Sequence, residues 1–231
     1  MASSGSSVIA DYEAVLFDLD GVMTPTADVH RRAWREVFED VLPRLAEGDQ
    51  TTYRDDDYEL HIDGRPRFEG VERLLRAHGV DLEWGDPSDP PGDDTVCAIG
   101  NRKNASFNEL LGRETLQPYP GSVALLKRIR EAGLRTAIVS SSANAKAVLV
   151  SAGLEGVFDV VVDGVVIAGR GLAGKPQPDP FLEAARLLDA PPDRAVVVED
   201  AIAGVEAGAA GGFGLVVGVA LDTDPDRLRE A

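Results

Sequence analysis

The stretch VLFDLDGVMT at residues 15–24 places two carboxylates directly after an apolar run. The run at 15–17 is typical of a buried strand, and Asp18, Asp20 and Gly21 follow it at once. An unpaired buried charge is costly, so these carboxylates require compensation by a cation, a proton or a reaction. The stretch therefore predicts a strand that ends at a charged functional site.

Short apolar runs rich in Val recur later in the chain, at 134–140, 157–162, 194–198 and 213–219. Their length and composition fit strands that are buried on both faces of a sheet. Helical patterns lie between them, at 122–132, 143–152, 180–188 and 203–210. This alternation predicts an α/β fold with a Rossmann-like parallel sheet, in which ligands bind beyond the carboxyl ends of the strands.

The region 27–113 differs from the rest because it is mostly helical and polar. Helical patterns occur at 29–42, 68–79 and 95–111, and loops occur at 54–67 and 84–94. We therefore expect a helical cap domain over 27–113, inserted into a core domain formed by 8–26 and 114–231. Residues 1–7 are expected to be a disordered tail, and the acidic run at 55–57 a solvated loop.

The composition limits the classes of partner. The 231 residues carry a net charge of −17, which disfavours binding to nucleic acid and to anionic lipid. No apolar run approaches the roughly 18 residues of a membrane span, and the start of the chain lacks a signal-peptide pattern. The single cysteine, Cys97, excludes a disulfide framework and favours a reducing compartment. We expect a cytoplasmic, monomeric protein with a small-molecule partner.

Polar side chains follow the other predicted strands as well. Ser140, Ser141 and Ser142 end one strand, and Glu199 and Asp200 end another. Lys175 lies in the loop GLAGKPQPDP at 171–180, after a third strand. Because parallel strands present their carboxyl ends at one edge of the sheet, we expect these side chains to meet Asp18 and Asp20 there.

This set of side chains indicates phosphoryl transfer. Clustered carboxylates require a hard cation, and Mg²⁺ takes oxygen ligands of this type. One acid can attack phosphorus while another moves a proton. Ser140 opens a helix N-terminus, which favours an anion, and Lys175 adds a positive charge. We predict a phosphoryl group held between Mg²⁺ and Lys175 and attacked by an acid.

Four segments resemble, in order, the four motifs of the haloacid dehalogenase-like hydrolase superfamily: DLDGVMT at 18–24, the strand end at Ser140, GKPQPDPF at 174–181 and VVVEDAIAGV at 196–205. The resemblance implies that Asp18 is the nucleophile and forms an aspartyl phosphate. It implies that Asp20 is the general acid and base, with its main-chain carbonyl on Mg²⁺.

The same resemblance assigns the remaining core residues. It implies that Asp18, Glu199 and Asp200 hold the metal, directly or through water. It implies that Ser140 and Lys175 grip the phosphoryl oxygens. A dehalogenase would not need a second aspartate in the first motif, so Asp20 favours phosphoryl transfer.

Three cap segments are similar to those of the β-phosphoglucomutase subfamily: TADVHRRAW at 26–34, GRPRFEG at 64–70 and GNRKN at 100–104. The similarity implies that His30 helps to hold Asp20 and that Arg67 binds the far phosphate of the substrate. It implies that Lys103 and Asn104 reach from the cap into the site. The other expected substrate contacts are Trp34, Ser141, Ser142 and Asn144.

Two activities stay open. A mutase would convert β-glucose 1-phosphate to glucose 6-phosphate, whereas a phosphatase with the same machinery would pass the phosphoryl group of Asp18 to water. Ala143 stands where the mutase has a phosphate-contacting lysine, which favours the phosphatase, and Arg65 is a candidate replacement for that cation. A non-catalytic sugar-phosphate binder would have lost the nucleophile, but Asp18 and Asp20 are both present.

Overall fold

The core of the molecule is a parallel sheet of five strands in the order β3-β2-β1-β4-β5. The computed structural model describes residues 11–54, 56–113, 116–221 and 223–231, and the expected tail at 1–7 lies outside them. The central strand is β1 (Ala14–Phe17), between β2 (Arg135–Val139) and β4 (Ala195–Glu199). The edge strands are β3 (Val160–Val162) and β5 (Leu215–Gly218). The prediction of an α/β fold with a parallel sheet is confirmed.

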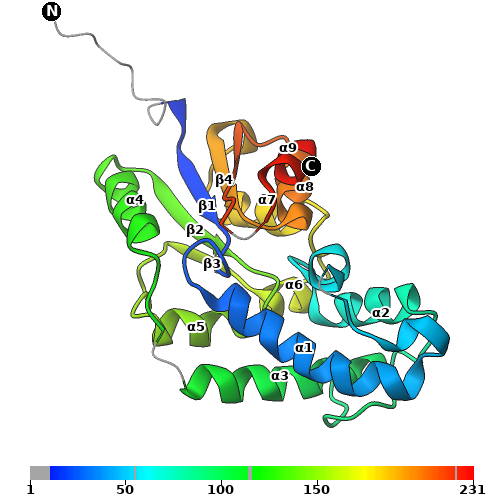
Figure 1. Ribbon diagram of the computed structural model, residues 1–231. Helices are drawn as coiled ribbons and strands as arrows, with labels where there is room; N and C mark the ends of the chain where they lie inside the picture. The colour runs from blue at the N-terminus through cyan, green and yellow to red at the C-terminus, as the bar shows by residue number, and fades with distance from the viewer. Residues whose placement is uncertain (1–10, 55, 114–115, 222) are drawn as a thin grey trace, which may run out of the picture.

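Alternate residues of the strands bury opposite faces of the sheet. Val15 and Phe17 share one cluster of buried side chains with α4 (Pro120–Glu131) and α5 (Ala145–Ser151). Ala14 and Leu16 share another with α6 (Gly164–Gly169), α7 (Asp179–Leu187) and α8 (Ile202–Ala210). The sheet is therefore covered by helices on both sides, as parallel sheets require (Figure 1).

Two short helices and the exposure of one strand differ from the sequence prediction. The helices are α6 and α9 (Pro225–Glu230), and a 3-10 turn, η4 (Pro192–Arg194), precedes β4. The expectation that every strand is buried on both faces is wrong for β5, where Leu215 and Val217 are each 38% exposed. β5 lies at the edge of the sheet and pairs only with β4 among the described strands.

Helices α1 (Thr26–Leu45), α2 (Arg67–Ala77) and α3 (Val96–Arg113) lie together beyond one end of the sheet (Figure 1). They are joined by a 3-10 turn, η2 (Gly48–Thr51), and a π turn, η3 (Tyr58–Ile62). A separate cluster of buried side chains fills this layer, including Phe38, Leu74 and Ile99. The helical cap is thus present, while its boundaries at 27 and 113 stay predictions.

Part of the acidic run at 55–57 contradicts the expected solvated loop. Asp57 is only 2% exposed, and its Oδ2 lies 2.9 Å from Nε2 of the buried His78. The same oxygen accepts a hydrogen bond of 2.7 Å from the main-chain N–H of Arg54. Asp57 is therefore a structural residue that ties the connection before η3 to the end of α2.

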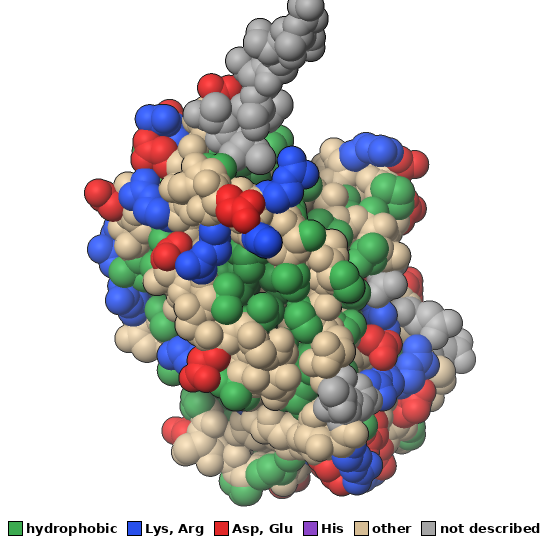
Figure 2. Space-filling view, turned by 90° about the vertical axis from the view of Figure 1, so that its left-hand side faces the viewer, with side chains coloured by type: hydrophobic (Ala, Val, Ile, Leu, Met, Phe, Trp, Pro, Cys, Tyr) green, Lys and Arg blue, Asp and Glu red, His purple; other side chains and the backbone are tan. Residues whose placement is uncertain are grey.

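The outer side of α4 carries an apolar patch. Figure 2 shows hydrophobic side chains gathered in the middle of this side of the molecule. A shallow groove there is lined by Val123, Leu126, Leu154 and Val157. Within the part of the chain that the structure describes, no helix has the length and apolar character needed to cross a bilayer.

Candidate active site

Asp18 and Lys175 form the buried centre of the site. Asp18 follows β1 directly and is 6% exposed, while Lys175 is fully buried. Nζ of Lys175 donates to Oδ1 of Asp18 at 2.6 Å, to Oε1 of Glu199 at 2.7 Å and to the main-chain oxygen of Val139 at 3.0 Å. All three ammonium protons are used, so Lys175 joins the carboxyl ends of β1, β2 and β4.

The carboxylates around Lys175 outnumber its single charge. Burial raises the pKa of Asp18 well above its usual range; Lys175 opposes this rise, and the negative charges of Glu199 and Asp20 add to it. Burial likewise raises the pKa of Asp200, followed by repulsion from Glu199, Asp18 and Asp63. The site therefore favours an additional cation, because a cation would relieve both the burial of negative charge and the mutual repulsion.

Asp20 lies two residues after Asp18, and residues of both the cap and the core hydrogen-bond to it. Its main-chain N–H donates to Oδ2 of Asp18 at 2.8 Å. Its Oδ1 accepts a hydrogen bond from the hydroxyl of Thr26 at the start of α1, and its Oδ2 accepts one of 3.2 Å from Ser140. Burial alone would raise the pKa of Asp20, but His30, Thr26 and Lys103 more than offset this and lower it to about 2. Asp20 is therefore ionised and able to accept a proton.

His30 connects Asp20 to Lys103. Its Nε2 lies 3.6 Å from Oδ1 of Asp20, and its Nδ1 contacts the ammonium of Lys103. Because an ammonium only donates, Nδ1 accepts, and the proton of the neutral ring lies on Nε2, facing Asp20. Burial and the charge of Lys103 lower the pKa of His30, while Asp20 opposes them, so the neutral ring is favoured. The ring stacks on Phe107 at 4.0 Å, which fixes its plane.

The loop after β2 supplies the hydroxyl groups. Ser140 is buried and accepts a hydrogen bond of 3.1 Å from the main-chain N–H of Ser142. Ser141 donates to the main-chain oxygen of Gly64 in the cap at 2.6 Å. The amide of Asn144 donates to Oδ1 of Asn104 in α3 at 2.6 Å. Two direct hydrogen bonds thus join this core loop to the cap.

The cap contributes two cations whose partners are neutral. Arg67 donates to Oδ1 of Asn101 at 3.1 Å and to Oδ1 of Asn104 at 2.8 Å. Lys103 is 3% exposed and lies over the rings of Trp34 and Phe107 at 4.9 and 4.8 Å. Burial lowers the pKa of Arg67; burial and the charge of Arg67 together lower the pKa of Lys103 well below its usual range. Neither cation forms an ion pair with a carboxylate of the described residues.

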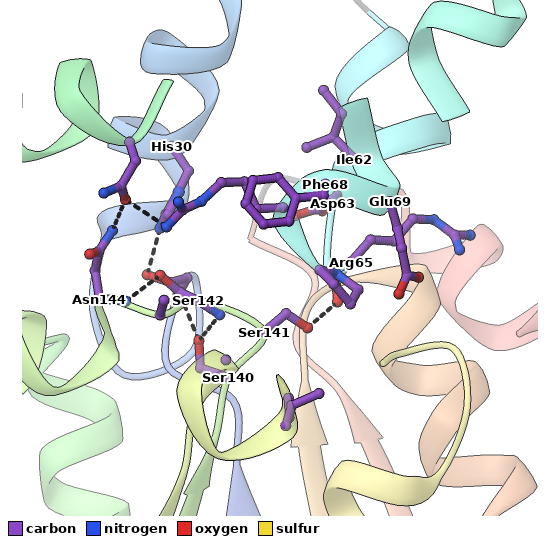
Figure 3. Close-up of a pocket in the computed structure, with 18 of the residues that line it drawn as sticks. His30, Ile62, Asp63, Arg65, Phe68, Glu69, Ser140, Ser141, Ser142 and Asn144 are labelled. Atoms are coloured by element: carbon purple, nitrogen blue, oxygen red, sulfur yellow. Dashed lines mark hydrogen bonds and ion pairs between the residues drawn. The ribbon is translucent and has the colours of Figure 1, made fainter. Parts of the chain in front are cut away.

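These groups line one cavity of about 770 Å³ between the cap and the core. Figure 3 shows the serine loop and Asn144 below it, with His30 and Phe68 above. Thirteen of the fourteen predicted site residues line it, and the remaining one, Lys175, lies directly behind Asp18 and Glu199. The structure therefore brings together side chains that the sequence separates by more than 180 positions.

Two predicted residues differ in their setting from the others. Trp34 is 3% exposed and stacks on Phe38 at 5.5 Å, so most of its ring belongs to the interior of the cap. Arg65 extends on the opposite side of the cavity from Asn144, beside Glu69 (Figure 3). The pKa of Arg65 is lowered first by burial, while Glu206 and Glu69 act to raise it. This geometry gives no support to Arg65 as a replacement for a cation at Ala143.

The oxygen atoms of the site fit a hard cation. Nowhere in the described ranges do three Asp, Glu, His or Cys side chains converge as the ligands of one ion. One or two carboxylates are enough for Mg²⁺, which completes its shell with main-chain oxygens, water and phosphate. The pKa values of Asp18 and Asp200 are raised, whereas Glu199 is already held by Lys175 and by the N–H of Ala201 at 2.7 Å.

Sequence reasoning missed two residues that line this cavity, Asp63 and Asn101, and one residue beside it, Thr26. Thr26 hydrogen-bonds Asp20, Asn101 hydrogen-bonds Arg67, and Asp63 faces Glu199 and Asp200 from the cap. Burial, and then repulsion from Glu199, raise the pKa of Asp63 to about 7. Asn101 lies within the segment GNRKN, and Asp63 directly precedes the segment GRPRFEG. The two cap segments that resemble the subfamily could therefore have pointed to both residues.

Comparison with known proteins agrees with this geometry. The model of the haloacid dehalogenase-like hydrolase family matches residues 12–212. A β-phosphoglucomutase of Mycobacterium tuberculosis is 44% identical over 210 residues, which cover 89% of this chain and 80% of that protein. A crystal structure of β-phosphoglucomutase from Clostridium difficile superimposes with a TM-score of 0.77 at 27% identity, covering 95% of this chain and 88% of that one.

A further relative binds a sugar bisphosphate. The structure of a CbbY variant from Rhodobacter sphaeroides in complex with xylulose-1,5-bisphosphate has a TM-score of 0.67 at 27% identity, covering 90% of this chain and 87% of that one. These similarities identify the chain as an enzyme of phosphoryl-group chemistry. It belongs to the haloacid dehalogenase-like hydrolase family, within the β-phosphoglucomutase-like subfamily.

Proposed function

We propose that this enzyme is a Mg²⁺-dependent β-phosphoglucomutase that converts β-glucose 1-phosphate to glucose 6-phosphate through an aspartyl phosphate on Asp18. In the first half-reaction, phosphorylated Asp18 passes its phosphoryl group to the 6-hydroxyl of the sugar, and Asp20 takes the proton of that hydroxyl. The product of this step is a glucose bisphosphate. The low pKa of Asp20 keeps its carboxylate ionised, which is the form that can accept this proton.

In the second half-reaction the bisphosphate turns within the closed cavity. An oxygen of Asp18 then attacks the phosphorus at position 1, the bond between phosphorus and the sugar oxygen breaks, and Asp20 returns its proton to that oxygen. Asp18 is phosphorylated again, so atoms and charge balance over the cycle. The 2.8 Å hydrogen bond from the N–H of Asp20 to Asp18 supports the proximity of the two groups.

The observation that carries this proposal is the pair of cap cations without acidic partners. Arg67 and Lys103 are removed from water and repel each other, and their near partners among the described residues are neutral: amide oxygens, an imidazole and aromatic rings. An anion bound between them would offset this cost, and Arg is well shaped for a phosphate. The reacting phosphate belongs at Asp18, so a second phosphate at Arg67 matches a bisphosphorylated intermediate.

Mg²⁺ is proposed at Asp18, Asp200 and the main-chain carbonyl of Asp20, with Glu199 reaching it through water. When bound, it would neutralise the phosphoryl oxygens on which charge develops. We expect Mg²⁺ to raise the melting temperature of the wild-type protein, because a ligand that binds only the folded state stabilises it. Asp200→Asn should lose that rise while Asp28→Asn, on the exposed side of α1, retains it.

A phosphatase is the alternative, and Ala143 favours it. Ala143 lines the cavity with a methyl group where the mutase has a phosphate-contacting lysine, so the second phosphate has one cation fewer. A weaker grip on the bisphosphate would let water reach phosphorylated Asp18 before the sugar hydroxyl does. The two activities share every residue discussed above except the acceptor of the phosphoryl group.

The deciding experiment supplies Mg²⁺, β-glucose 1-phosphate and a trace of glucose 1,6-bisphosphate, and follows glucose 6-phosphate and inorganic phosphate together. Glucose 6-phosphate with little phosphate would establish the mutase. Phosphate without the isomer would establish hydrolysis and overturn the mutase. Arg67→Ala, compared with Arg130→Ala on the outside of α4, should raise KM about tenfold or more if Arg67 binds the second phosphate.

A further inference from the structure

Asn101 is the one partner of Arg67 that connects it to a second segment of the cap. Its Oδ1 accepts the hydrogen bond from Nη1 of Arg67 at 3.1 Å. Its Nδ2 donates to the main-chain oxygens of Pro87 and Asp89, at 3.0 and 2.8 Å. All three hydrogen-bonding directions used by this amide have good distances, so its position is fixed from both sides.

The loop that holds Asn101 is the segment 84–94, which we call the acidic loop. Its start is tied to the start of α3 by main-chain hydrogen bonds from Cys97 to Trp84 at 3.0 Å and from Val96 to the preceding residue, Glu83, at 2.9 Å. Trp84 packs edge-on against Phe68, the neighbour of Arg67, at 6.3 Å. Trp84 and Pro87 also line the cavity. The acidic loop therefore forms one wall of the site next to Arg67.

Three carboxylates of this loop, those of Asp86, Asp89 and Asp93, have partners other than Arg67. Asp86 accepts from Ser88 within the loop, and Asp89 accepts from Thr95 at 2.8 Å. Asp93 pairs with Arg102 and Arg44 on the outside of the cap. What reaches Arg67 is the neutral amide of Asn101 instead. A carboxylate in that place would pair with the guanidinium and cancel the charge that an anion needs.

We propose that Asn101 is a positioning residue that holds Arg67 ready for the non-reacting phosphate without neutralising it, and that the acidic loop acts on substrate affinity through Asn101. This inference rests on the proposed function, in which Arg67 binds that phosphate. Preorganisation of this kind lowers the entropy lost when the anion binds. Gly100 supports the arrangement, since a Cβ there would lie 2.7 Å from the ring of Phe68 and 3.2 Å from Cδ of Arg67.

The test compares two substrates in four proteins. Glucose 1,6-bisphosphate carries the second phosphate and is varied as the activator of the conversion of β-glucose 1-phosphate to glucose 6-phosphate. p-Nitrophenyl phosphate presents one phosphate and no second anion, and its hydrolysis is followed by the release of p-nitrophenol. The proteins are the wild type, Asn101→Ala, Asn101→Asp and the matched control Asn108→Ala, which lies on the exposed part of the same helix. Thermal melting of each protein confirms that it is folded, and the isosteric Asn101→Asp keeps the test available if Asn101→Ala does not fold.

For Asn101→Ala we expect KM for the bisphosphate to rise about tenfold with kcat within about twofold, since one hydrogen bond to a charged group is lost. Asn101→Asp should raise KM further, because its carboxylate pairs with Arg67 and no longer donates to Pro87 and Asp89. Neither variant should change kcat/KM for p-nitrophenyl phosphate, and Asn108→Ala should change nothing. A merely structural role would lower the activity on both substrates together.

An unchanged KM for the bisphosphate in both Asn101 variants, or equal losses on the two substrates, would overturn the inference. The failure of the proposed function gives a different pattern, because then Arg67→Ala would also leave KM for the bisphosphate unchanged. If Arg67→Ala raises KM and the Asn101 variants do not, only the role of Asn101 is wrong.

Discussion

At the scale of single residues, the site depends on a balance of charge around Lys175. Its ammonium is the only described cation that contacts both Asp18 and Glu199, and it is fully buried between them. Burial alone would lower the pKa of Lys175, but the two carboxylates more than offset this and raise it. Lys175 is therefore charged near neutral pH, and it compensates the buried carboxylates of Asp18 and Glu199.

Asp18→Asn tests the nucleophile. We expect turnover to fall by at least about 10⁴-fold, since a covalent nucleophile is lost. The fold should survive, because the raised pKa of Asp18 means that its ionised form opposes folding above pH 4, and the amide removes that charge. Activity and thermal melting of the same preparation give both results, with Asp28→Asn as the control. Retained turnover would contradict the aspartyl-phosphate mechanism.

Lys175→Met tests the charge balance. Removal of the cation leaves Asp18 and Glu199 buried without compensation, so we expect the free energy of unfolding at pH 7 to fall by about 3–5 kcal/mol. The deficit should shrink at pH 5. When the pKa of a carboxyl group is higher in the folded than in the unfolded state, the protein loses stability as the pH rises above the unfolded pKa. It regains that stability when the group is protonated.

Urea unfolding at the two pH values measures the effect of Lys175→Met. Lys127→Met on the exposed side of α4 is the control and should change the unfolding free energy by less than about 0.5 kcal/mol. A deficit that is the same at both pH values would show that lost packing, not charge, is responsible.

At the scale of elements, the turn after β1 decides whether the carboxylates can meet. Gly21 has φ of +89°, a conformation that side chains with a Cβ rarely adopt. A Cβ there would lie 1.9 Å from Oδ2 of Asp200. The loop after β1 and the loop after β4 approach each other this closely only because residue 21 has no side chain.

Gly21→Ala and Gly79→Ala separate these two causes. Gly79, after α2, has φ of +73° and open space around its Cα, so its substitution reports the backbone cost alone, about 1–2 kcal/mol. Gly21→Ala should cost at least about 1 kcal/mol more and lower kcat tenfold or more, because Asp200 must move. Urea unfolding and steady-state kinetics of both variants provide the comparison. Equal effects of the two substitutions would refute the close approach.

At the scale of the whole molecule, cap and core enclose the cavity and are joined at the serine loop. The hydrogen bond of 2.6 Å from Ser141 to Gly64 and that of 2.6 Å from Asn144 to Asn104 hold the two layers together. In the proposed mechanism, closure of this kind would exclude water from phosphorylated Asp18. The ratio of phosphoryl transfer to hydrolysis is therefore a property of the assembly of the two layers.

Ser141→Ala should shift that ratio toward hydrolysis. With one bond between cap and core removed, worth about 1 kcal/mol, we expect inorganic phosphate per glucose 6-phosphate to rise about two- to fivefold. The control is Ser151→Ala at the exposed end of α5. The assay is the one that follows both products from β-glucose 1-phosphate. A ratio equal to that of the wild type would mean that this hydrogen bond does not limit opening of the cap.

The sequence by itself determined the fold class and the meeting of the polar strand ends, because these follow from local patterns. Val-rich runs alternating with helical patterns can bury both faces only as a parallel sheet, and parallel strands bring Asp18, Ser140 and Asp200 to one edge. The exposure of β5 and the burial of Asp57 were missed, because position in the sheet and a distant histidine decide them.

Only the tertiary structure decided what surrounds the cations of the cap. An arginine or a lysine can occur in a solvated helix or in a buried cavity, and no local sequence pattern predicts which amide side chains contact Arg67 and Lys103. The packing of α2 against α3 brings Asn101 and Asn104 to Arg67, and the packing of α1 against α3 brings His30 to Lys103. These partners lie 34 to 73 residues apart in the sequence and meet because the helices pack through their buried faces. Many buried residues together determine that packing, so no single segment predicts it.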